Sequence, residues 1–248
     1  MDRLIYTAMT GAIHTMNQQA TTSHNLANVT TTGFRAQIDS FRAVPVVSQG
    51  APTRDFVVDA EVGTDFRPGA IQQTGRMLDL ALINEGWLAV EMPDGTEAYT
   101  RNGSLTISTE GLLQTREGYN VRSLEGGPMV LPTDLQYSIE MDGSVSSIDD
   151  TTTPRTVMGL GQLKLVNPPT EQLVRGADGF FRMKNGGEAP AEPGVKLINS
   201  ALEASNVNTA ETLVQIISLA RQFELQMNMI GHADENASRA IGVLTLNG

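Results

Sequence analysis

The chain of 248 residues has no cysteine, one tryptophan and three histidines. Without cysteine it can form neither disulfides nor thiolate metal sites. No apolar run approaches the roughly 18 residues that a membrane-spanning helix needs. The N-terminal residues 1–6 also lack a charged stretch followed by a continuous apolar run, so we expect neither a membrane span nor a cleaved secretory signal.

Positive charge is scarce and clustered nowhere. Lys and Arg number 17 against 28 Asp and Glu, which gives a net charge of −11. Most of the negative charge lies in the middle of the chain, between residues 44 and 199. Binding to a phosphate backbone requires clustered Lys and Arg, so nucleic acid is not an expected partner.

The residues that catalysis would need are sparse. His14 and His24 are ten residues apart with no Glu between them, so a metal site would need other ligands. Gly159-Leu160-Gly161 lacks the rest of a dinucleotide-binding fingerprint and precedes a strand. We expect no catalytic residue, no cofactor and no metal, and therefore no enzyme.

Apolar residues recur at alternating steps of three and four at both ends of the chain, a spacing typical of coiled-coil helices. Near the N-terminus, a helix is expected over residues 3–28, with a repeat formed by Tyr6, Met9, Ile13, Met16, Ala20, Ser23 and Ala27. Near the C-terminus, a helix is expected from about 208 to 246, with a repeat formed by Leu213, Ile216, Ala220, Phe223, Met227, Ile230, Asp234, Ala237, Ile241 and Leu244. Asp234 is either a surface residue where the repeat slips or a polar contact that sets the register.

The sequence between the helices is rich in strand and turn signals. Trp87–Met92 and Gln136–Met141 are typical of short strands, and Asn-Gly or Asp-Gly pairs such as Asn102-Gly103 indicate hairpins. We predict an antiparallel β domain, barrel-like or sandwich-like, with Trp87 in its core. The fold class is therefore α+β: a terminal helix (1–33), an extended connector (34–77), an inserted β domain (78–196) and a C-terminal helical segment (197–248), with both helices in one coiled-coil-like layer.

Motifs in the same order resemble those of the flagellar basal-body rod protein family, the rod and hook proteins of the bacterial flagellum. The signature segment is Ser23–Arg35, in which Thr32, Gly33, Phe34 and Arg35 form the family's turn. The other matching motifs are Asn84–Val90, Tyr99–Gly103, Asp178–Phe181 and Leu202–Val207. Phe34 replaces the commoner tyrosine, and Ala204 stands where glycine is usual, which puts a close backbone contact there in doubt.

Within the family, Gln18-Gln19, Trp87 and Ala220–Met227 resemble the proximal rod subunit more than the distal one. The resemblance implies a structural subunit of a hollow rod in the periplasm that transmits torque. It implies export by the flagellar type III apparatus without a cleaved signal, and partners that are copies of itself and other rod subunits. A distal rod or hook subunit, or a non-flagellar dimeric binding module, stays open as an alternative. The expected assembly interface comprises Tyr6, Met9, Ile13, Met16, Asn25, Leu26, Asn28, Leu213, Ile216, Phe223, Met227, Ile230, Ile241 and Leu244.

Overall fold

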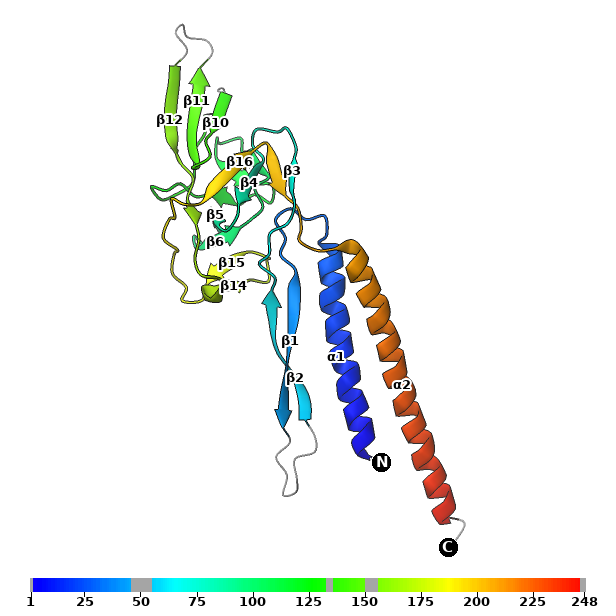
Figure 1. The fold of residues 1–248 in the computed structure, drawn as a ribbon. Coiled ribbons are helices and arrows are strands. Elements are labelled where there is room, and N and C mark those ends of the chain that lie inside the picture. The colour runs from blue at the N-terminus through cyan, green and yellow to red at the C-terminus, as the bar shows by residue number, and fades with distance from the viewer. Residues whose placement is uncertain (1, 46–54, 133–135, 150–155, 246–248) are drawn as a thin grey trace. The chain divides into compact units, whose positions relative to one another are not determined.

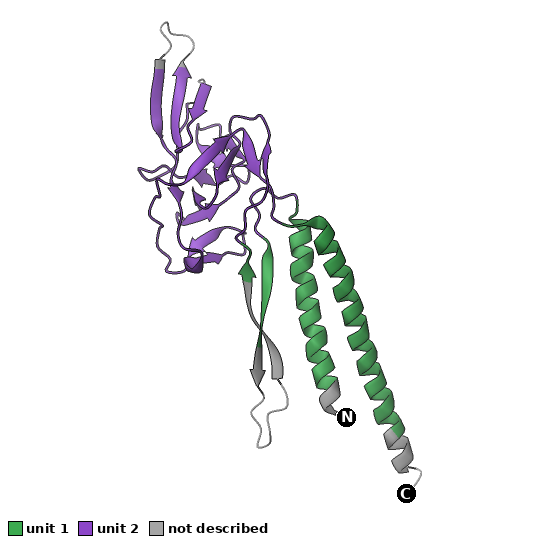
Figure 2. Cartoon of the chain, in the orientation of Figure 1, with its two compact units in different colours: residues 1–29, 36–65, 207–248 green, residues 30–35, 66–206 purple. Residues whose placement is uncertain are grey.

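The computed structural model describes residues 2–45, 55–132, 136–149 and 156–245. The chain forms two compact units, shown in separate colours in Figure 2. The helical unit comprises residues 1–29, 36–65 and 207–248, and the β unit comprises residues 30–35 and 66–206. No described helix is both long enough and apolar enough to span a membrane.

The helical unit contains two long helices that run antiparallel and side by side (Figure 1). The N-terminal helix, α1, spans Asp2–Ala27, and the C-terminal helix, α2, spans Thr209–Thr245. Asn208 caps α2, because its Oδ1 accepts the backbone N–H of Ala210 at 3.1 Å. At the end of α1 the amide of Asn28 donates to the carbonyl of His24 at 2.9 Å. Both predicted helices are therefore present.

A two-stranded hairpin completes the helical unit. It pairs β1 (Gln37–Pro45) with β2 (Asp55–Thr64) antiparallel, with a register shift between Ser40 and Phe41. The hairpin lies within the segment 34–77, for which the sequence predicts an extended connector.

The β unit consists of short, antiparallel strands, as the turn signals predicted. Its largest sheet follows the path β14-β15-β6-β5-β9-β8-β7, with β13 paired to β5. These strands are β5 (Trp87–Glu91), β6 (Glu97–Thr100), β7 (Leu105–Ile107), β8 (Leu113–Thr115), β9 (Asn120–Val121), β13 (Leu165–Val166), β14 (Leu173–Arg175) and β15 (Phe181–Met183). A 3₁₀ turn, Thr170–Gln172, precedes β14.

Three smaller sheets complete the unit. One orders β10 (Gln136–Ile139), β11 (Ser144–Asp149) and β12 (Thr156–Gln162). The other two pair β16 (Lys196–Asn199) with β4 (Leu80–Ile83) and β17 (Ala201–Glu203) with β3 (Ile71–Gln73). The segment that leads into α2 thus belongs to the sheets of the β unit up to residue 203.

Two expectations about the β domain need correction. The strand path of the largest sheet ends at β14 and β7 and does not close into a barrel within the described residues. Asn102-Gly103 is not a hairpin turn either, since β6 and β7, which flank it, do not pair with each other. A Cβ at Gly103 would lie 1.8 Å from the carbonyl oxygen of Leu80, so this glycine permits a close approach of backbones.

Among the described residues, three hydrophobic clusters form the core of the β unit. The largest brings together leucines from many strands, among them Leu80, Leu88 and Leu105. Trp87 is buried in a second cluster, where its ring lies 4.6 Å from that of Phe181. Trp87 therefore contributes to the core as predicted.

Candidate assembly interface

Helix α1 presents three distinct stripes along its length. The first, its inner stripe, is buried and consists of small or short side chains: Ala8, Ala12, Thr15 and Thr22. It contacts α2, since the hydroxyl of Thr15 lies 3.1 Å from Oε1 of Gln226. Small residues allow the two helix backbones to approach closely.

The second stripe of α1 holds the hairpin. The amide of Asn25 donates to the carbonyl of Gln37 and accepts the N–H of the same residue, both at 2.8 Å. Thr21 donates to Asp39 at 2.7 Å, and the ring of His14 lies edge-on to Phe41 at 5.6 Å. Asn25 thus serves as a hydrogen-bonding partner for the first residue of β1.

The third stripe of α1, its outer stripe, is uncovered and apolar. Tyr6 is 59% exposed, Met9 44%, Ile13 50% and Met16 56%. Three members each follow a member of the inner stripe by one residue, which turns them about 100° around the helix axis. The predicted N-terminal repeat is therefore the face of α1 that the single chain leaves in solvent.

On α2 the covered side also recurs at steps of four and three. This inner stripe of α2 consists of Thr212, Ile216, Leu219, Phe223, Gln226, Ile230, Ala233 and Ala237. This stripe includes Ile216, Phe223, Ile230 and Ala237 of the predicted repeat, and its other members each lie one residue before a repeat position. Leu213, Met227 and Asp234 are exposed, while their neighbours Thr212 and Ala233 are buried and Gln226 is partly covered. Asp234 thus lies outside this stripe, on the exposed surface of the single chain.

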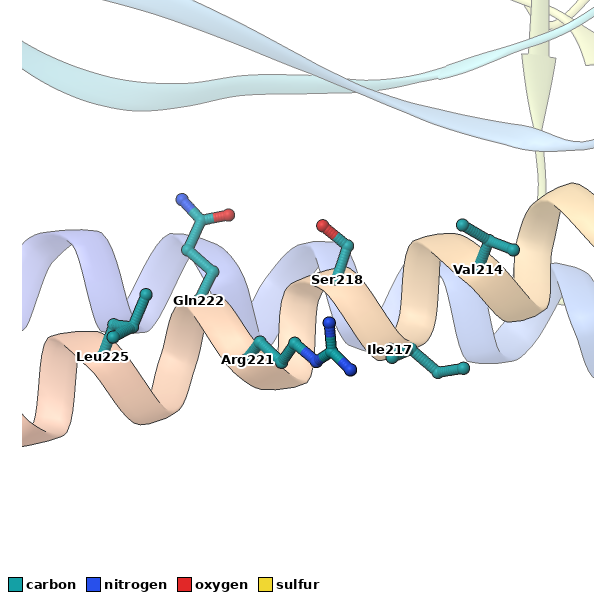
Figure 3. Close-up of a pocket in the computed structure, with 6 residues that line it drawn as sticks. All are labelled: Val214, Ile217, Ser218, Arg221, Gln222 and Leu225. Atoms are coloured by element: carbon teal, nitrogen blue, oxygen red, sulfur yellow. The ribbon is translucent and has the colours of Figure 1, made fainter.

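A further apolar face of α2 is uncovered. A groove is lined by α2 residues alone, and Figure 3 shows them along one side of the helix: Val214, Ile217, Ser218, Arg221, Gln222 and Leu225. Val214 is 68% exposed and Leu225 65%. Both helices therefore carry apolar side chains that the single chain does not cover.

The remaining predicted interface residues have other surroundings. Leu26 and Asn28 at the end of α1 are half-buried. Ile241 and Leu244 belong to the last turns of α2, whose side chains lie outside the described residues.

The signature turn after α1 requires its glycine. Gly33 has φ +68, and a Cβ there would lie 2.4 Å from the carbonyl carbon of Arg101. Its N–H donates to the carbonyl of Glu203 at 2.8 Å, and Thr32 donates to Oδ1 of Asn102 at 2.6 Å. The turn is thereby fastened to two other family motifs.

Glu203 lies at the centre of a buried ion cluster. Its carboxylate accepts from Arg35 at 2.5 Å and from Nε of Arg101 at 2.7 Å, and all three side chains are at most 2% exposed. The N–H of Gly69 adds a hydrogen bond at 2.8 Å. Burial lowers the pKa of Arg101, although the charge of Glu203 opposes this effect. Two guanidinium groups share one carboxylate, so Glu203 is the buried negative charge that both Arg35 and Arg101 bind.

Arg101 and Phe34 connect this cluster to the remaining motifs. Arg101 also donates to the carbonyls of Gly86 at 2.7 Å and Asn84 at 2.9 Å. The ring of Phe34 is buried beneath the guanidinium of Arg175, whose Cζ lies 4.5 Å from the ring centroid and 5.9 Å from that of Phe181. Segments that are far apart in sequence and carry the family resemblance therefore meet at one place.

A close backbone contact at Ala204, which the alanine in place of glycine put in doubt, is nevertheless present. A Cβ on Gly69 would lie 1.9 Å from the carbonyl oxygen of Ala204, so Gly69 supplies the space. Nearby, the N–H of Asn206 donates to the carbonyl of Phe34 at 3.3 Å, and its amide donates to the carbonyl of Arg67 at 3.0 Å. The β-unit ends of the connections to the helical unit are thus hydrogen-bonded to one another.

A second ion network lies on the largest sheet. Glu97 is buried and accepts from Arg122 at 2.8 Å and Lys164 at 2.5 Å. Both cations also bind Glu188, which is 57% exposed, and the hydrogen bond from Arg122 lowers the pKa of Glu188. Across the described residues, no group of three or more metal-binding side chains could hold a metal ion.

Sequence reasoning missed the inner stripe of α1 and the ion cluster. The stripe could have been found from the same steps of three and four, offset by one residue. The cluster carried no local signal, since Arg35 and Glu203 are 168 residues apart.

Three segments of the chain match known protein families. Residues 5–35 match the family described as flagella basal body rod protein, and residues 198–243 match the flagellar basal body rod FlgEFG protein C-terminal family. Residues 81–147 match the flagellar hook protein FlgE/F/G D1 domain. The helices, the signature turn and the β unit thus define a protein of the flagellar rod and hook class.

Full-length relatives narrow this class. The chain is 42% identical to the flagellar basal-body rod protein FlgF of Escherichia coli (strain K12), with 100% of both chains covered. It is 41% identical to FlgF of Salmonella typhimurium over the same share, and 29% identical to the rod protein FlgG of Bacillus subtilis, covering 95% of this chain and 96% of that one. The chain belongs to the flagellar basal-body rod protein family and is a structural subunit of the rod. Its sequence is more similar to these two FlgF proteins than to this FlgG protein.

Proposed function

We propose that the protein is a subunit of the proximal rod that assembles through its terminal helices with copies of itself and with other rod subunits. In the assembled rod, α1 and α2 form an inner, coiled-coil-like layer around a central channel, with the β unit outside. The rod crosses the periplasm, transmits torque and performs no chemistry. The subunit reaches it through the flagellar type III export apparatus without a cleaved signal.

The observation that carries this proposal is the outer stripe of α1. Tyr6, Met9, Ile13 and Met16 are each about half exposed, although they are among the larger apolar residues of the helix. Fully burying such a side chain contributes about 1.5–3 kcal/mol, so covering an exposed half contributes roughly half of that. A neighbouring subunit that covers the outer stripe of α1 or the uncovered face of α2 therefore contributes several kcal/mol in total, on the order of the sum over these side chains. Methionine can adapt to neighbours that are not equivalent.

The test is a double substitution in this stripe, Ile13→Ser with Met16→Ser. Both side chains are about half exposed, so the purified monomer should keep its fold, with only a small fall in its urea midpoint. Basal bodies purified from cells that carry only this variant should lack the chain, and the cells should not swim. Asn17→Ser, which changes an exposed residue of α1 outside the stripe, is the matched control and should leave swimming intact.

The alternatives predict other outcomes, in this experiment or in a map of basal bodies that contain the unmodified chain. Incorporation of the double variant at the normal level would refute assembly through this stripe. A cryo-EM map of basal bodies with the unmodified chain beyond the proximal rod would make it a distal rod or hook subunit. A discrete dimer found away from the flagellar axis would favour a binding module.

A further inference from the structure

One long polar side chain, Gln226, interrupts the otherwise small or apolar inner stripe of α2. It follows Phe223 and precedes Ile230 in that stripe and is only partly exposed. The hydroxyl of Thr15 lies within hydrogen-bond distance of two acceptors, Oε1 of Gln226 at 3.1 Å and the carbonyl of Gly11 at 3.0 Å. Gln226 therefore has a polar partner on the opposite helix.

The space for this amide comes from Gly11. A Cβ at Gly11 would lie 2.9 Å from Nε2 at the flexible end of the Gln226 side chain, so the amide would have to move from its present position. Gly11 and Thr15 are four residues apart, so they lie on the same side of α1. Together they form a site on α1 that is shaped for the Gln226 side chain.

Hydrophobic burial alone would favour a different pairing. The outer stripe of α1, with Met9, Ile13 and Met16, would bury more apolar area against α2 than the inner stripe with Ala8, Ala12 and Thr15. A rotation of α1 by one residue position, about 100°, would bring the outer stripe against α2 and turn the inner stripe away from it. It would also place apolar side chains opposite Gln226 and remove the hydroxyl and the glycine space. A half-buried amide that loses its hydrogen-bond partner is less favourable.

We infer that Gln226, together with Thr15 and Gly11, determines which face of α1 packs against α2 of the same chain. Single polar residues in helical interfaces are known to fix register at a cost in stability. The contact turns the small stripe inward and leaves the outer stripe free. This inference concerns the single chain, and it stands or falls independently of the proposed rod assembly.

The absence of cysteine makes a direct test possible, because one introduced thiol is the only one in the chain. Ala12→Cys reports on the inner stripe, where Ala12 is 6% exposed, and Ile13→Cys reports on the outer stripe, where Ile13 is 50% exposed. With Gln226 intact, a thiol reagent should modify the Ile13→Cys monomer much faster than the Ala12→Cys monomer. In the Gln226→Leu background the ratio of the two rates should fall on the order of tenfold. The reason is that packing the outer stripe of α1 against α2 no longer leaves an amide without a hydrogen-bond partner.

Two further variants separate face selection from loss of structure. Gln222→Leu makes the same change one turn away at an exposed position of α2 and should leave the ratio unchanged. Thr15→Val should reproduce the effect of Gln226→Leu, and Thr15→Ser, which retains the hydroxyl, should restore the native ratio. Far-UV circular dichroism of each variant verifies that both helices persist.

Two results would overturn the inference. The first is equal labelling of the Ala12→Cys and Ile13→Cys variants with Gln226 present, which means that no face is selected. The second is an unchanged ratio in both Gln226→Leu and Thr15→Val. That result would assign the rotation of α1 to the contacts of Thr21 and Asn25 with the hairpin instead.

Discussion

At the scale of single residues, Gly33 has two separate reasons to be glycine. Its φ of +68 favours glycine, and a Cβ would also collide with the backbone of Arg101. Gly75 has a similar φ of +74, but a Cβ there would meet nothing within 4 Å. The pair therefore separates the cost of the conformation from the cost of the collision.

We expect Gly33→Ala to destabilise the β unit more than Gly75→Ala. The conformation alone costs about 1 kcal/mol or somewhat more in both variants, and the collision adds to this cost only at Gly33. Urea unfolding followed by the fluorescence of Trp87 measures both effects. Equal midpoints for the two variants would show that the turn can move away from Arg101.

Glu203 is the second residue whose role can be isolated. Glu203→Gln retains the shape of the side chain but leaves the guanidinium groups of Arg35 and Arg101 buried without a negative charge. We expect a loss of about 3–5 kcal/mol in the free energy of unfolding, the usual cost of breaking a buried ion pair.

Glu188→Gln is the control for this loss. It removes a carboxylate of the same type that also binds two cations, but one that is 57% exposed. An exposed ion pair contributes at most about 1 kcal/mol, so the control should unfold close to the parent chain. A Glu203→Gln effect as small as that of the control would mean that the cluster contributes little to stability.

At the scale of elements, the two units differ in how well their backbones are covered. Strand β5 is buried at Trp87, Leu88, Ala89 and Val90, whereas α1 as far as Met16 and α2 as far as Met229 leave large apolar residues in solvent. Helices obtain most of their stability from packing, so helices covered on part of their surface open more readily.

We therefore expect amide hydrogens of α1 and α2 to exchange faster than those of β5 in the dilute monomer. In the assembled rod the helices should become protected, because neighbours would cover their outer faces. Hydrogen exchange detected by mass spectrometry compares the two states. Protection of the helices in the monomer equal to that of β5 would contradict this prediction.

The sequence predicted the elements better than their contacts. The long helical repeats gave both helices, because many residues contribute to one periodic signal. The same signal could not choose between Leu213 and Thr212, or between Met227 and Gln226, because adjacent residues continue steps of three and four equally well. Hydrophobicity favoured Leu213 and Met227, but the side of α2 that faces α1 carries Thr212 and Gln226. A short side chain lets the helices pack closely, and Gln226 has a hydrogen-bonding partner in Thr15.

Turn residues show a similar division. Gly143 has a positive φ in the β10–β11 hairpin, as an Asp-Gly pair predicts. Asn102-Gly103 has the same composition signal, but its glycine admits the carbonyl of Leu80 and its asparagine accepts a hydrogen bond from Thr32. The structural role of Asn102-Gly103 depends on Thr32 and Leu80, which are distant in sequence, so a local sequence pattern cannot predict it.

At the scale of the whole molecule, surface carboxylates set the response to acid. Hydrogen bonds from Arg182 lower the pKa of Asp178, and hydrogen bonds from Arg122 and Lys164 lower that of Glu188. A carboxylate whose pKa is lower in the folded state stabilises that state above its unfolded pKa. This contribution is lost as the pH falls through the folded pKa.

The β unit should therefore become less stable as the pH falls from about 5 to about 2. Each exposed pair contributes at most about 1 kcal/mol, so the change from these two groups is modest. Urea midpoints at pH 7 and pH 3 measure it, and the double variant Asp178→Asn, Glu188→Gln should show a smaller difference between the two. A midpoint that rises on acidification would refute the assignment.

The connections between the two units have a mechanical consequence. The chain passes from one unit to the other four times, after residues 29, 35, 65 and 206. The β-unit ends of three of these passages, at Phe34, Arg67 and Asn206, are joined by hydrogen bonds. A force passed between the units is divided among four covalent links in parallel. While α1 and α2 stay packed together, no single break in the backbone detaches one unit from the other. If one connecting segment is cleaved, the remaining three still transmit the force.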